Sequence, residues 1–397
     1  MSYDFTTRIN RQPQNSSKWQ GMRKHNPEVP EGIVPLSVAD MELKNPPEIT
    51  EGLKQFLDNR ILGYTDAGED YYTETVNWMQ RRHHWTIDKD WLVLLPGVVT
   101  AINVAVRAFV QPREKVAILT PVYYPFKKTI EACGCRTVTS SLINQDGVYS
   151  INFEDLETKL ADPNVKMLIF CSPHNPIGRV WTKEELMKVG ELCLKHDILI
   201  VSDEIHFDLI LPGHKHTVFA SLSKELSDRM IVCTSVSKTF NLAGMQCSNI
   251  VISNPELRAA YKATMSSYIN GHLNIMAYEA ATLAYRHCEG WLEELLVLLE
   301  TNRKTAVDFF AEHFPKAIVS PLEGTYLLWV DLRAYFADQD EQEEFMTKKA
   351  LLFLDEGYLF GEEGSGFERI NLACPTSLLK ESLMRLAAAY QNNPAAA

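Results

Sequence analysis

The feature that most constrains the fold is a regular alternation of short apolar segments with longer amphipathic segments between residues 92 and 234. Continuous apolar runs of this length are typical of strands buried on both faces, as in a parallel sheet covered by helices. We therefore expect an α/β fold with a mixed, mostly parallel sheet between helices. The expected strands are residues 92–95, 116–120, 165–171, 198–202 and 230–234, and the expected helices among them are 98–109, 126–132 and 183–195.

The pattern differs at both ends of the chain. The first 45 residues are rich in Pro and Asn and show little periodicity, so we expect an arm that crosses a surface, followed by a helix at 47–59. Beyond residue 254 the sequence is mostly helical, and its expected elements are helices 290–313 and 377–390 and strands 326–330 and 369–373. We predict a large domain of residues 46–289 and a smaller α+β domain formed by residues 1–45 and 290–397.

Composition excludes several classes of protein. The 397 residues carry 39 Lys and Arg against 51 Asp and Glu, a net charge of −12, which argues against nucleic-acid or anionic-membrane partners. The eight cysteines are scattered, several of them in apolar runs, and a lone pair at 133 and 135 is a weak metal signal. The sequence shows neither a secretory signal nor an apolar run of transmembrane length. We expect a reduced, cytoplasmic protein without a metal site.

Lys238 lies in the first of three polar segments that follow expected strands, the position where open α/β sheets bind ligands. It belongs to SVSKTF, residues 235–240, directly after the strand 230–234. A lysine amine that is buried near an anion and an aldehyde is suited to form a Schiff base. The alternative is a surface lysine at the start of a helix.

Two further polar side chains follow neighbouring strands. Asp203 ends the run ILIVSD, and an acid at this position can hold a heterocyclic nitrogen protonated, although it can equally cap a helix or bind a metal. Asn175 lies in SPHNPIG, residues 172–178, where Pro and Gly favour a turn that directs its amide into the crevice. The alternative for this segment is a plain tight turn.

The order of these three segments resembles that of the fold-type I pyridoxal 5′-phosphate (PLP) enzymes of the class I/II aminotransferase family, over nearly the whole chain. Within that family the sequence is similar to the carbon–sulfur β-lyases of the cystathionine β-lyase (MalY/PatB) type. The segments that carry this closer likeness are VADME at 38–42, NPP at 45–47, GYT at 63–65 and DEIH at 203–206. The resemblance implies the PLP-transferase fold type I.

The resemblance also implies roles around the ring of the cofactor. Lys238 would bind the PLP aldehyde, and Asp203 would pair with the ring nitrogen and keep it protonated. Asn175 would donate a hydrogen bond to the phenolic oxygen. Tyr123 would stack on the ring, with Tyr124 as the alternative for that role.

The phosphate group would lie at the start of the helix 98–109, where the backbone N–H groups of Val98 and Val99 form an anion site. Ser235 and Ser237 would add hydroxyl donors. Tyr64 matches a tyrosine that reaches the phosphate of the neighbouring subunit in relatives, so the resemblance implies a homodimer with a shared active site.

Arg369 matches the arginine that binds the substrate carboxylate, together with Asn175, and a guanidinium suits this bidentate contact. Its alternative is a surface arginine in a salt bridge. Two positions depart from many aminotransferases, which carry an arginine where this chain has Gln246 and a tyrosine near the cofactor where it has His206. Phosphate binding must then depend more on neutral donors.

These roles predict a PLP-dependent carbon–sulfur β-lyase. Its substrates would be amino acids such as L-cystathionine or L-cysteine, and its products a thiol, pyruvate and ammonia. The alternative is an aminotransferase that uses the same cofactor. A third hypothesis, a non-catalytic regulatory binder, is disfavoured because Lys238 and Asp203 are both present and because no helix-turn-helix segment is evident.

Overall fold

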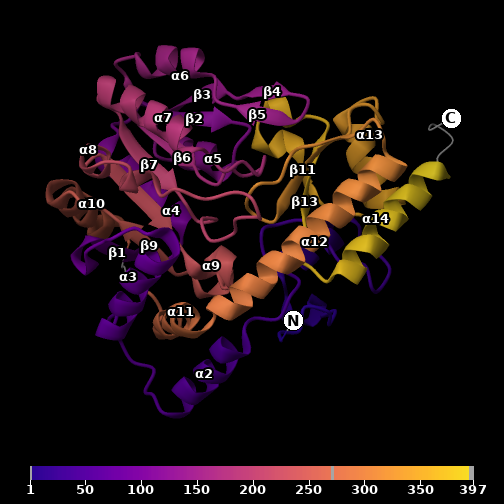
Figure 1. Cartoon of the computed structure of the whole chain (residues 1–397), viewed down its shortest axis with the longest axis horizontal. Helices are drawn as coiled ribbons and strands as arrows, with labels where there is room; N and C mark the ends of the chain where they lie inside the picture. The colour runs from indigo at the N-terminus through magenta and orange to yellow at the C-terminus, as the bar shows by residue number, and fades with distance from the viewer. Residues whose placement is uncertain (1, 270–271, 393–397) are drawn as a thin grey trace.

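The computed structural model describes residues 2–269 and 272–392, which are arranged around a seven-stranded sheet (Figure 1). The sheet has the strand order β1-β9-β8-β7-β6-β2-β3. Five neighbouring strands, from β8 to β3, are parallel, whereas β9 is antiparallel to both β1 and β8. The mixed, mostly parallel sheet expected from the sequence is confirmed.

The strands of this sheet are β1 (Leu92–Leu95), β2 (Lys115–Thr120), β3 (Arg136–Ser141), β6 (Val165–Cys171), β7 (Leu199–Asp203), β8 (Met230–Thr234) and β9 (Ser248–Val251). The helices are α1 (Ser17–His25), α2 (Pro47–Asp58), α3 (Glu69–His83), α4 (Val98–Phe109), α5 (Pro125–Ala132), α6 (Phe153–Leu160), α7 (Lys183–Lys195), α8 (Lys224–Ser227), α9 (Val236–Thr239), α10 (Pro255–Tyr268), α11 (Ile275–His287), α12 (Glu289–His313), α13 (Gln339–Glu344) and α14 (Thr376–Gln391). A hairpin of β4 (Ile143–Gln145) and β5 (Val148–Ser150) follows β3.

Helices cover both faces of the sheet, and this explains why its strands are apolar throughout. Successive residues of a strand point to opposite faces. In β6, Ile169 belongs to the core cluster formed with α4, α5 and α10, and its neighbour Phe170 belongs to the cluster that contains residues of α6 and α7. Both side chains are completely buried. A strand between two helical layers therefore has no polar face, as the sequence pattern indicated.

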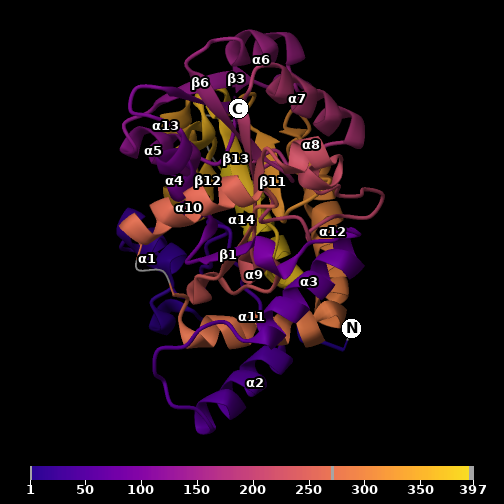
Figure 2. The same ribbon diagram turned by 90° about the vertical axis from the view of Figure 1, so that its left-hand side faces the viewer.

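A second, antiparallel sheet lies in the C-terminal part of the chain. Its order is β10-β11-β13-β12, with β10 (Ile318–Val319), β11 (Leu327–Asp331), β12 (Asp355–Glu356) and β13 (Phe367–Asn371). Helices α12 and α14 run side by side next to it (Figure 1). In Figure 2, α2 lies at the end of the molecule opposite α6. The two sheets fall within the two predicted domains, whose boundaries stay a prediction.

The N-terminal segment is more ordered than expected. We predicted an arm with little regular structure, but the segment contains α1, and Trp19 and Met41 are buried. The backbone of Leu36 donates to Phe353 O and accepts from Asn371 N, so the segment is hydrogen-bonded beside the small sheet. Apart from η1 (Gln12–Gln14) and α1, residues 2–45 form no helix or strand, and the arm stays a prediction; its buried residues were not foreseen, because isolated apolar residues between Pro and Asn give no periodic signal.

Among the residues that the structure describes, we find no helix with both the length and the apolar character needed to cross a bilayer.

Candidate active site

The carboxyl ends of β6, β7 and β8 converge on one cavity of about 270 Å³. Asp203 is the last residue of β7, Asn175 follows β6 in a tight turn, and Lys238 lies in the short helix α9 after β8. Parallel strands end at the same edge of the sheet, which brings together side chains distant in sequence. Of the predicted site residues, those that line the cavity are Val98, Val99, Tyr123, Asn175, Asp203, His206, Ser237 and Lys238.

The amine of Lys238 lies at the cavity wall. Its Nζ donates a hydrogen bond to the carbonyl oxygen of Ala39 at 2.7 Å, and the hydroxyl of Tyr326 donates to the same oxygen at 2.9 Å. Burial, together with the nearby positive charge of Arg369, lowers the pKa of Lys238 to about 8. With this pKa, roughly a tenth of the amine is neutral at pH 7, and the neutral form is the nucleophile.

Asp203 supplies a buried carboxyl group to the same cavity. Its side chain accepts a hydrogen bond from the backbone N–H of Ile205 at 3.2 Å. Burial raises the pKa of Asp203 to about 7, although the positive charge of Lys238 opposes the shift. Few hydrogen bonds or positive charges of the protein stabilise this buried carboxylate. It is therefore suited to bind a cationic N–H donor in the cavity.

His206 contributes a neutral imidazole next to Asp203. Burial lowers the pKa of His206 well below its usual value, and the charges of Lys238 and Arg369 act in the same direction. Its ring lies edge-on to Tyr326, with centroids 6.0 Å apart. The imidazole is therefore uncharged at neutral pH and adds no positive charge beside the cofactor cavity.

The first turn of α4 forms the end of the cavity expected to bind phosphate. Gly97 precedes the helix with φ +100°, a conformation that favours glycine, and no side chain of the described residues caps the helix. The free N–H groups of Val98 and Val99 and the helix dipole favour an anion at this position. Gln246, at the position where many aminotransferases carry an arginine, also lines the cavity, and its amide is a neutral donor.

The two serines of α9 are not equivalent. Ser237 lines the cavity. Ser235 lies behind the lining as the N-cap of α9, where its Oγ donates to the carbonyl of Cys247 and accepts from the backbone N–H of Ser237. Its single hydroxyl hydrogen is therefore used inside the protein. Direct contact of Ser235 with a phosphate stays a prediction, and the structure indicates that Ser235 positions Ser237.

Arg369 joins the site through Asn175. One guanidinium nitrogen donates to Asn175 Oδ1 at 2.9 Å, and the other donates to Asp355. The third nitrogen, Nε, is buried without a hydrogen-bond partner among the described residues. A buried donor of this kind favours an acceptor such as a substrate carboxylate. Asn175 in turn accepts with its oxygen, so its NH₂ group is the part that can donate into the cavity.

Tyr123 forms part of one cavity wall. Its backbone N–H donates to the carbonyl of Asn175 at 3.1 Å, and its ring lies 5.6 Å from that of Tyr124. Burial raises the pKa of Tyr123 to about 12, so its hydroxyl stays protonated at neutral pH. Stacking of Tyr123 on a cofactor ring stays a prediction, and its position in the cavity wall is compatible with that role.

Besides Ser235 and Arg369, a third predicted site residue, Tyr64, does not line the cavity. Tyr64 is fully exposed on the segment between α2 and α3, where Ile61 and Leu62 are exposed as well. It was predicted to reach the site of a neighbouring subunit, so its contact with phosphate stays a prediction.

Three residues of the site were missed by the sequence analysis: Ala39, Asp355 and Tyr326. Ala39 contributes through its backbone oxygen, which leaves no signature in a sequence. Asp355 accepts from Arg369 and from the N–H of Val38 at 2.8 Å, a contact between segments more than 300 residues apart. Residues 38–42 resemble the carbon–sulfur lyase branch of the family, and this likeness could have pointed to Ala39. We used the segment only as evidence of the family and assigned no role to its residues.

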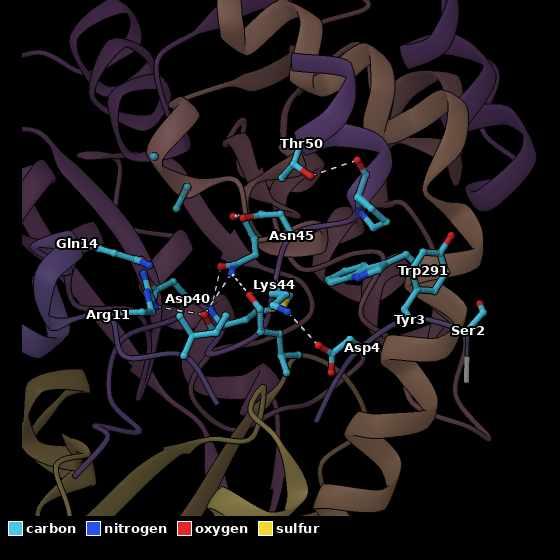
Figure 3. Close-up of a pocket in the computed structure, with 17 residues that line it drawn as sticks. Ser2, Tyr3, Asp4, Arg11, Gln14, Asp40, Lys44, Asn45, Thr50 and Trp291 are labelled. Carbon is cyan, nitrogen blue, oxygen red and sulfur yellow. Dashed lines mark hydrogen bonds and ion pairs between the residues drawn. The ribbon is translucent and has the colours of Figure 1, made fainter. Parts of the chain in front are cut away.

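The segment that carries Ala39 is fixed beside α9 by hydrogen bonds around a neighbouring cavity of about 520 Å³ (Figure 3). Asn241 Oδ1 accepts from the backbone N–H of Met41 at 2.9 Å, and Asn45 Nδ2 donates to the carbonyl of Phe240 at 2.9 Å. Lys44 pairs with Asp4 at the outer edge, as Figure 3 shows. The N-terminal residues thus determine where the Ala39 carbonyl lies.

These groups fit PLP by chemistry. The amine of Lys238 suits the aldehyde, the carboxyl group of Asp203 suits the ring nitrogen, and the uncapped start of α4 suits the phosphate. The NH₂ group of Asn175 suits the phenolic oxygen, and Tyr123 offers an aromatic wall.

Comparisons with known proteins identify the family of this chain. A family model described as "Aminotransferase class I and II" matches residues 31–386. Cystathionine beta-lyase PatB of Bacillus subtilis (strain 168) is 43% identical over 356 residues, which cover 90% of this chain and 92% of PatB. Protein MalY of Escherichia coli (strain K12) is 30% identical over 356 residues, covering 89% of this chain and 90% of MalY.

Among solved structures, cystalysin from Treponema denticola, whose crystal structure contains a PLP cofactor, is 47% identical. It superimposes with a TM-score of 0.97 over 99% of this chain and 100% of that chain. The fold is accordingly the fold type I of PLP enzymes, as the sequence resemblance implied. With a family match that spans residues 31–386, the chain belongs to the class I and II aminotransferase family.

Proposed function

We propose that this protein is a PLP-dependent carbon–sulfur β-lyase that acts on L-cystathionine- or L-cysteine-type amino acids. The observation that carries the proposal is the cavity lined by both Lys238, with its low-pKa amine, and the buried Asp203. The likeness to cystathionine beta-lyase PatB and to cystalysin supports the reaction class.

The net reaction converts a substrate R–S–CH₂–CH(NH₃⁺)–COO⁻ and one water into a thiol RSH, pyruvate and ammonium. The Cα–H and Cβ–S bonds break, and the electron pair of the Cα–H bond forms a Cα=Cβ double bond. Sulfur leaves with the electrons of the Cβ–S bond and receives a proton. Water then replaces the nitrogen at Cα, so the reaction needs no oxidant or reductant.

When bound, PLP supplies an electron sink that stabilises negative charge at Cα after its proton has left. Asp203 would supply the negative charge that keeps the ring nitrogen of PLP protonated. Lys238 Nζ would hold the aldehyde of PLP and would serve as the base that accepts the Cα proton. Arg369 and Asn175 orient the substrate carboxylate and so fix the direction of the Cα–H bond. His206 remains neutral beside Asp203.

The experiment that tests the reaction class is incubation of the purified holoenzyme with L-cystathionine in the absence of any keto acid. We expect pyruvate and free thiol in equal amounts. If no product forms until a keto acid is added, the protein is an aminotransferase and the proposal is wrong. Lys238→Ala should abolish both turnover and the visible absorbance of the bound cofactor, and retention of both would exclude Lys238 as the attachment site.

The proposal includes a homodimer with a shared active site. Ile61, Leu62 and Tyr64, in the segment after α2, are exposed apolar side chains. Exposed apolar side chains of this kind are typical of protein interfaces. Tyr64 of each subunit would reach the phosphate-binding end of the other subunit's cavity.

A further inference from the structure

The segment that supplies the hydrogen-bond acceptor of the reactive amine is held by four charged side chains that the mechanism above does not use. We call residues 38–42 the acceptor segment. Lys18 Nζ on α1 pairs with Asp40 Oδ1 at 2.9 Å and with Glu42 Oε1 at 2.8 Å. Arg11 pairs with the same two carboxylates at 2.8 Å each, and Figure 3 shows it facing Asp40. The side chain of Lys18 is completely buried, which is rare for a lysine and requires such pairing.

The two cations also bind the backbone of the acceptor segment. Lys18 Nζ donates to the carbonyl oxygen of Asp40 at 3.0 Å, and Arg11 donates to the next carbonyl oxygen along the chain at 3.2 Å. Asn371 of β13 donates to the carbonyl oxygens of Val38 and Asp40 at 2.7 Å each. Each carbonyl oxygen from residue 38 to residue 41 therefore accepts a hydrogen bond from a side chain.

Val38, at the start of the acceptor segment, adopts a backbone conformation that valine rarely takes. Its φ is +54°, where the branched Cβ crowds the backbone. Such a conformation persists only where the surroundings impose it, and here the N–H of Val38 donates to Asp355 Oδ2 at 2.8 Å. Val38 is exposed, so packing of its side chain does not offset the strain. The strained residue sets the direction of the chain just before the Ala39 carbonyl.

We propose that Asp40 is a positioning residue that holds the acceptor of the Lys238 amine in place and, with its negative charge, favours the ammonium form. Its pairing with Lys18 and Arg11 fixes the backbone on one side of the Ala39 carbonyl. A fixed acceptor and a nearby negative charge both stabilise the protonated amine. This inference rests on the proposed role of Lys238, but not on the choice between a lyase and an aminotransferase, because both need a reactive amine.

Asp40 differs from the other groups around the amine because it has no assigned role in the site. The titratable and charged side chains that act on Lys238 or share its acceptor are Asp40, Asp203, His206, Tyr326, Asp355 and Arg369. Arg369 lowers the pKa of Lys238, whereas the three carboxylates raise it. Asp203 is proposed to bind the ring nitrogen, and Asp355 binds Arg369. A variant of Asp40 therefore changes the surroundings of the amine and leaves the proposed contacts to cofactor and substrate in place.

The test measures the amine directly in the full-length apoenzyme. Competitive labelling with acetic anhydride, followed by mass spectrometry of the peptide that carries Lys238, reports how much of the amine is neutral at each pH. Asp40→Asn keeps the size of the side chain and one oxygen acceptor, but leaves the four-residue cluster with a net positive charge. The labelling rate at pH 6 should rise about three- to tenfold, because a fall in pKa of about half a unit to one unit increases the neutral fraction by that factor.

Glu42→Gln is the matched control. Glu42 binds the same two cations and is more deeply buried than Asp40, but it lies three residues beyond the Ala39 carbonyl. The control should leave the labelling rate of Lys238 within twofold of the parent protein. If Asp40→Asn also stays within twofold, or if Glu42→Gln raises the rate equally, the role assigned to Asp40 is wrong.

Val38→Gly keeps the proposal testable if Asp40→Asn does not fold. Glycine adopts a φ of +54° without strain, so the denaturation midpoint should not fall. The Ala39 carbonyl would be held less firmly, and the labelling rate of Lys238 should rise by at least about twofold. A rate equal to that of the parent protein would contradict the role of the acceptor segment. Retention of the cofactor absorbance in Lys238→Ala would instead overturn the proposed role of Lys238, whatever the labelling shows.

Discussion

Replacing Asp355 by asparagine tests whether Arg369 depends on a buried counter-charge. Arg369 is 3% exposed and donates to Asp355 from one guanidinium nitrogen. Asparagine keeps an oxygen that can accept from the N–H of Val38, so the substitution removes mainly the charge. Removal of one partner from a buried ion pair costs about 3–5 kcal/mol of stability, because the other charge stays buried without compensation. We expect the free energy of unfolding of Asp355→Asn to fall by that amount.

The assay is chemical denaturation of the holoenzyme, followed by circular dichroism. Asp331→Asn is the matched control, because Asp331 lies in the same sheet and pairs with Arg333, whose side chain is 60% exposed. Asp331 is buried, at 8% side-chain exposure, but Arg333 stays in contact with water when the charge of Asp331 is removed, so the control should lose at most about 1 kcal/mol. L-Alanine, which has a carboxylate but no leaving group, should restore part of the stability lost in Asp355→Asn by supplying a new anion to Arg369.

The reasoning fails if Asp355→Asn loses less than about 1 kcal/mol, as the control does. It also fails if L-alanine stabilises the parent enzyme and the variant equally, because Arg369 would then not respond to the missing charge.

Three further predictions concern the cofactor. Burial lowers the pKa of Lys238 to about 8, and the neutral amine is the reactive form. The rate of PLP binding to the apoenzyme should therefore rise about tenfold per pH unit below pH 8 and level off above pH 8. A flat stopped-flow profile between pH 6 and 8 would contradict this prediction. Gly97→Ala should cost about 1–3 kcal/mol in a thermal or chemical melt and weaken PLP binding, because a Cβ at φ +100° is strained even though it meets no atom within 4 Å. Mixing inactive Lys238→Ala subunits with inactive Tyr64→Ala subunits should restore activity if the sites are shared. In the mixed dimer, one site combines the native Lys238 of one subunit with the native Tyr64 of the other. An inactive mixture, with subunit exchange confirmed, would exclude the shared site.

The sequence predicted best the elements that are buried on both faces. The predicted bounds of β1, α4, β6, α7 and β8 agree with the structure, because apolar runs bounded by turns leave little freedom of assignment. β3 was missed because it lies at the sheet edge and reads RTVTSS, with polar residues at most positions. β9 was missed because SNIV is too short and too mixed in polarity to give a signal.

The site was predictable where side chains follow strands directly. Lys238, Asp203 and Asn175 were found because the ends of parallel strands meet, so that position alone indicates proximity. Asp355 and Tyr326 were not found, because their partners come from distant segments and their roles depend on tertiary packing. Ser235 shows a further limit of prediction from sequence. Its place in the motif was clear, but only the structure reveals that its hydroxyl group donates a hydrogen bond to the carbonyl oxygen of Cys247.

The hydrogen bond from Lys238 to the carbonyl of Ala39 has a practical consequence for engineering. No strand of the seven-stranded sheet comes from the first 45 residues, yet trimming this stretch, or fusing another protein at its beginning, would disturb the reactive amine some two hundred positions away. Proteolysis within the first 45 residues should therefore abolish activity before the protein unfolds. Tags for purification are better attached behind α14.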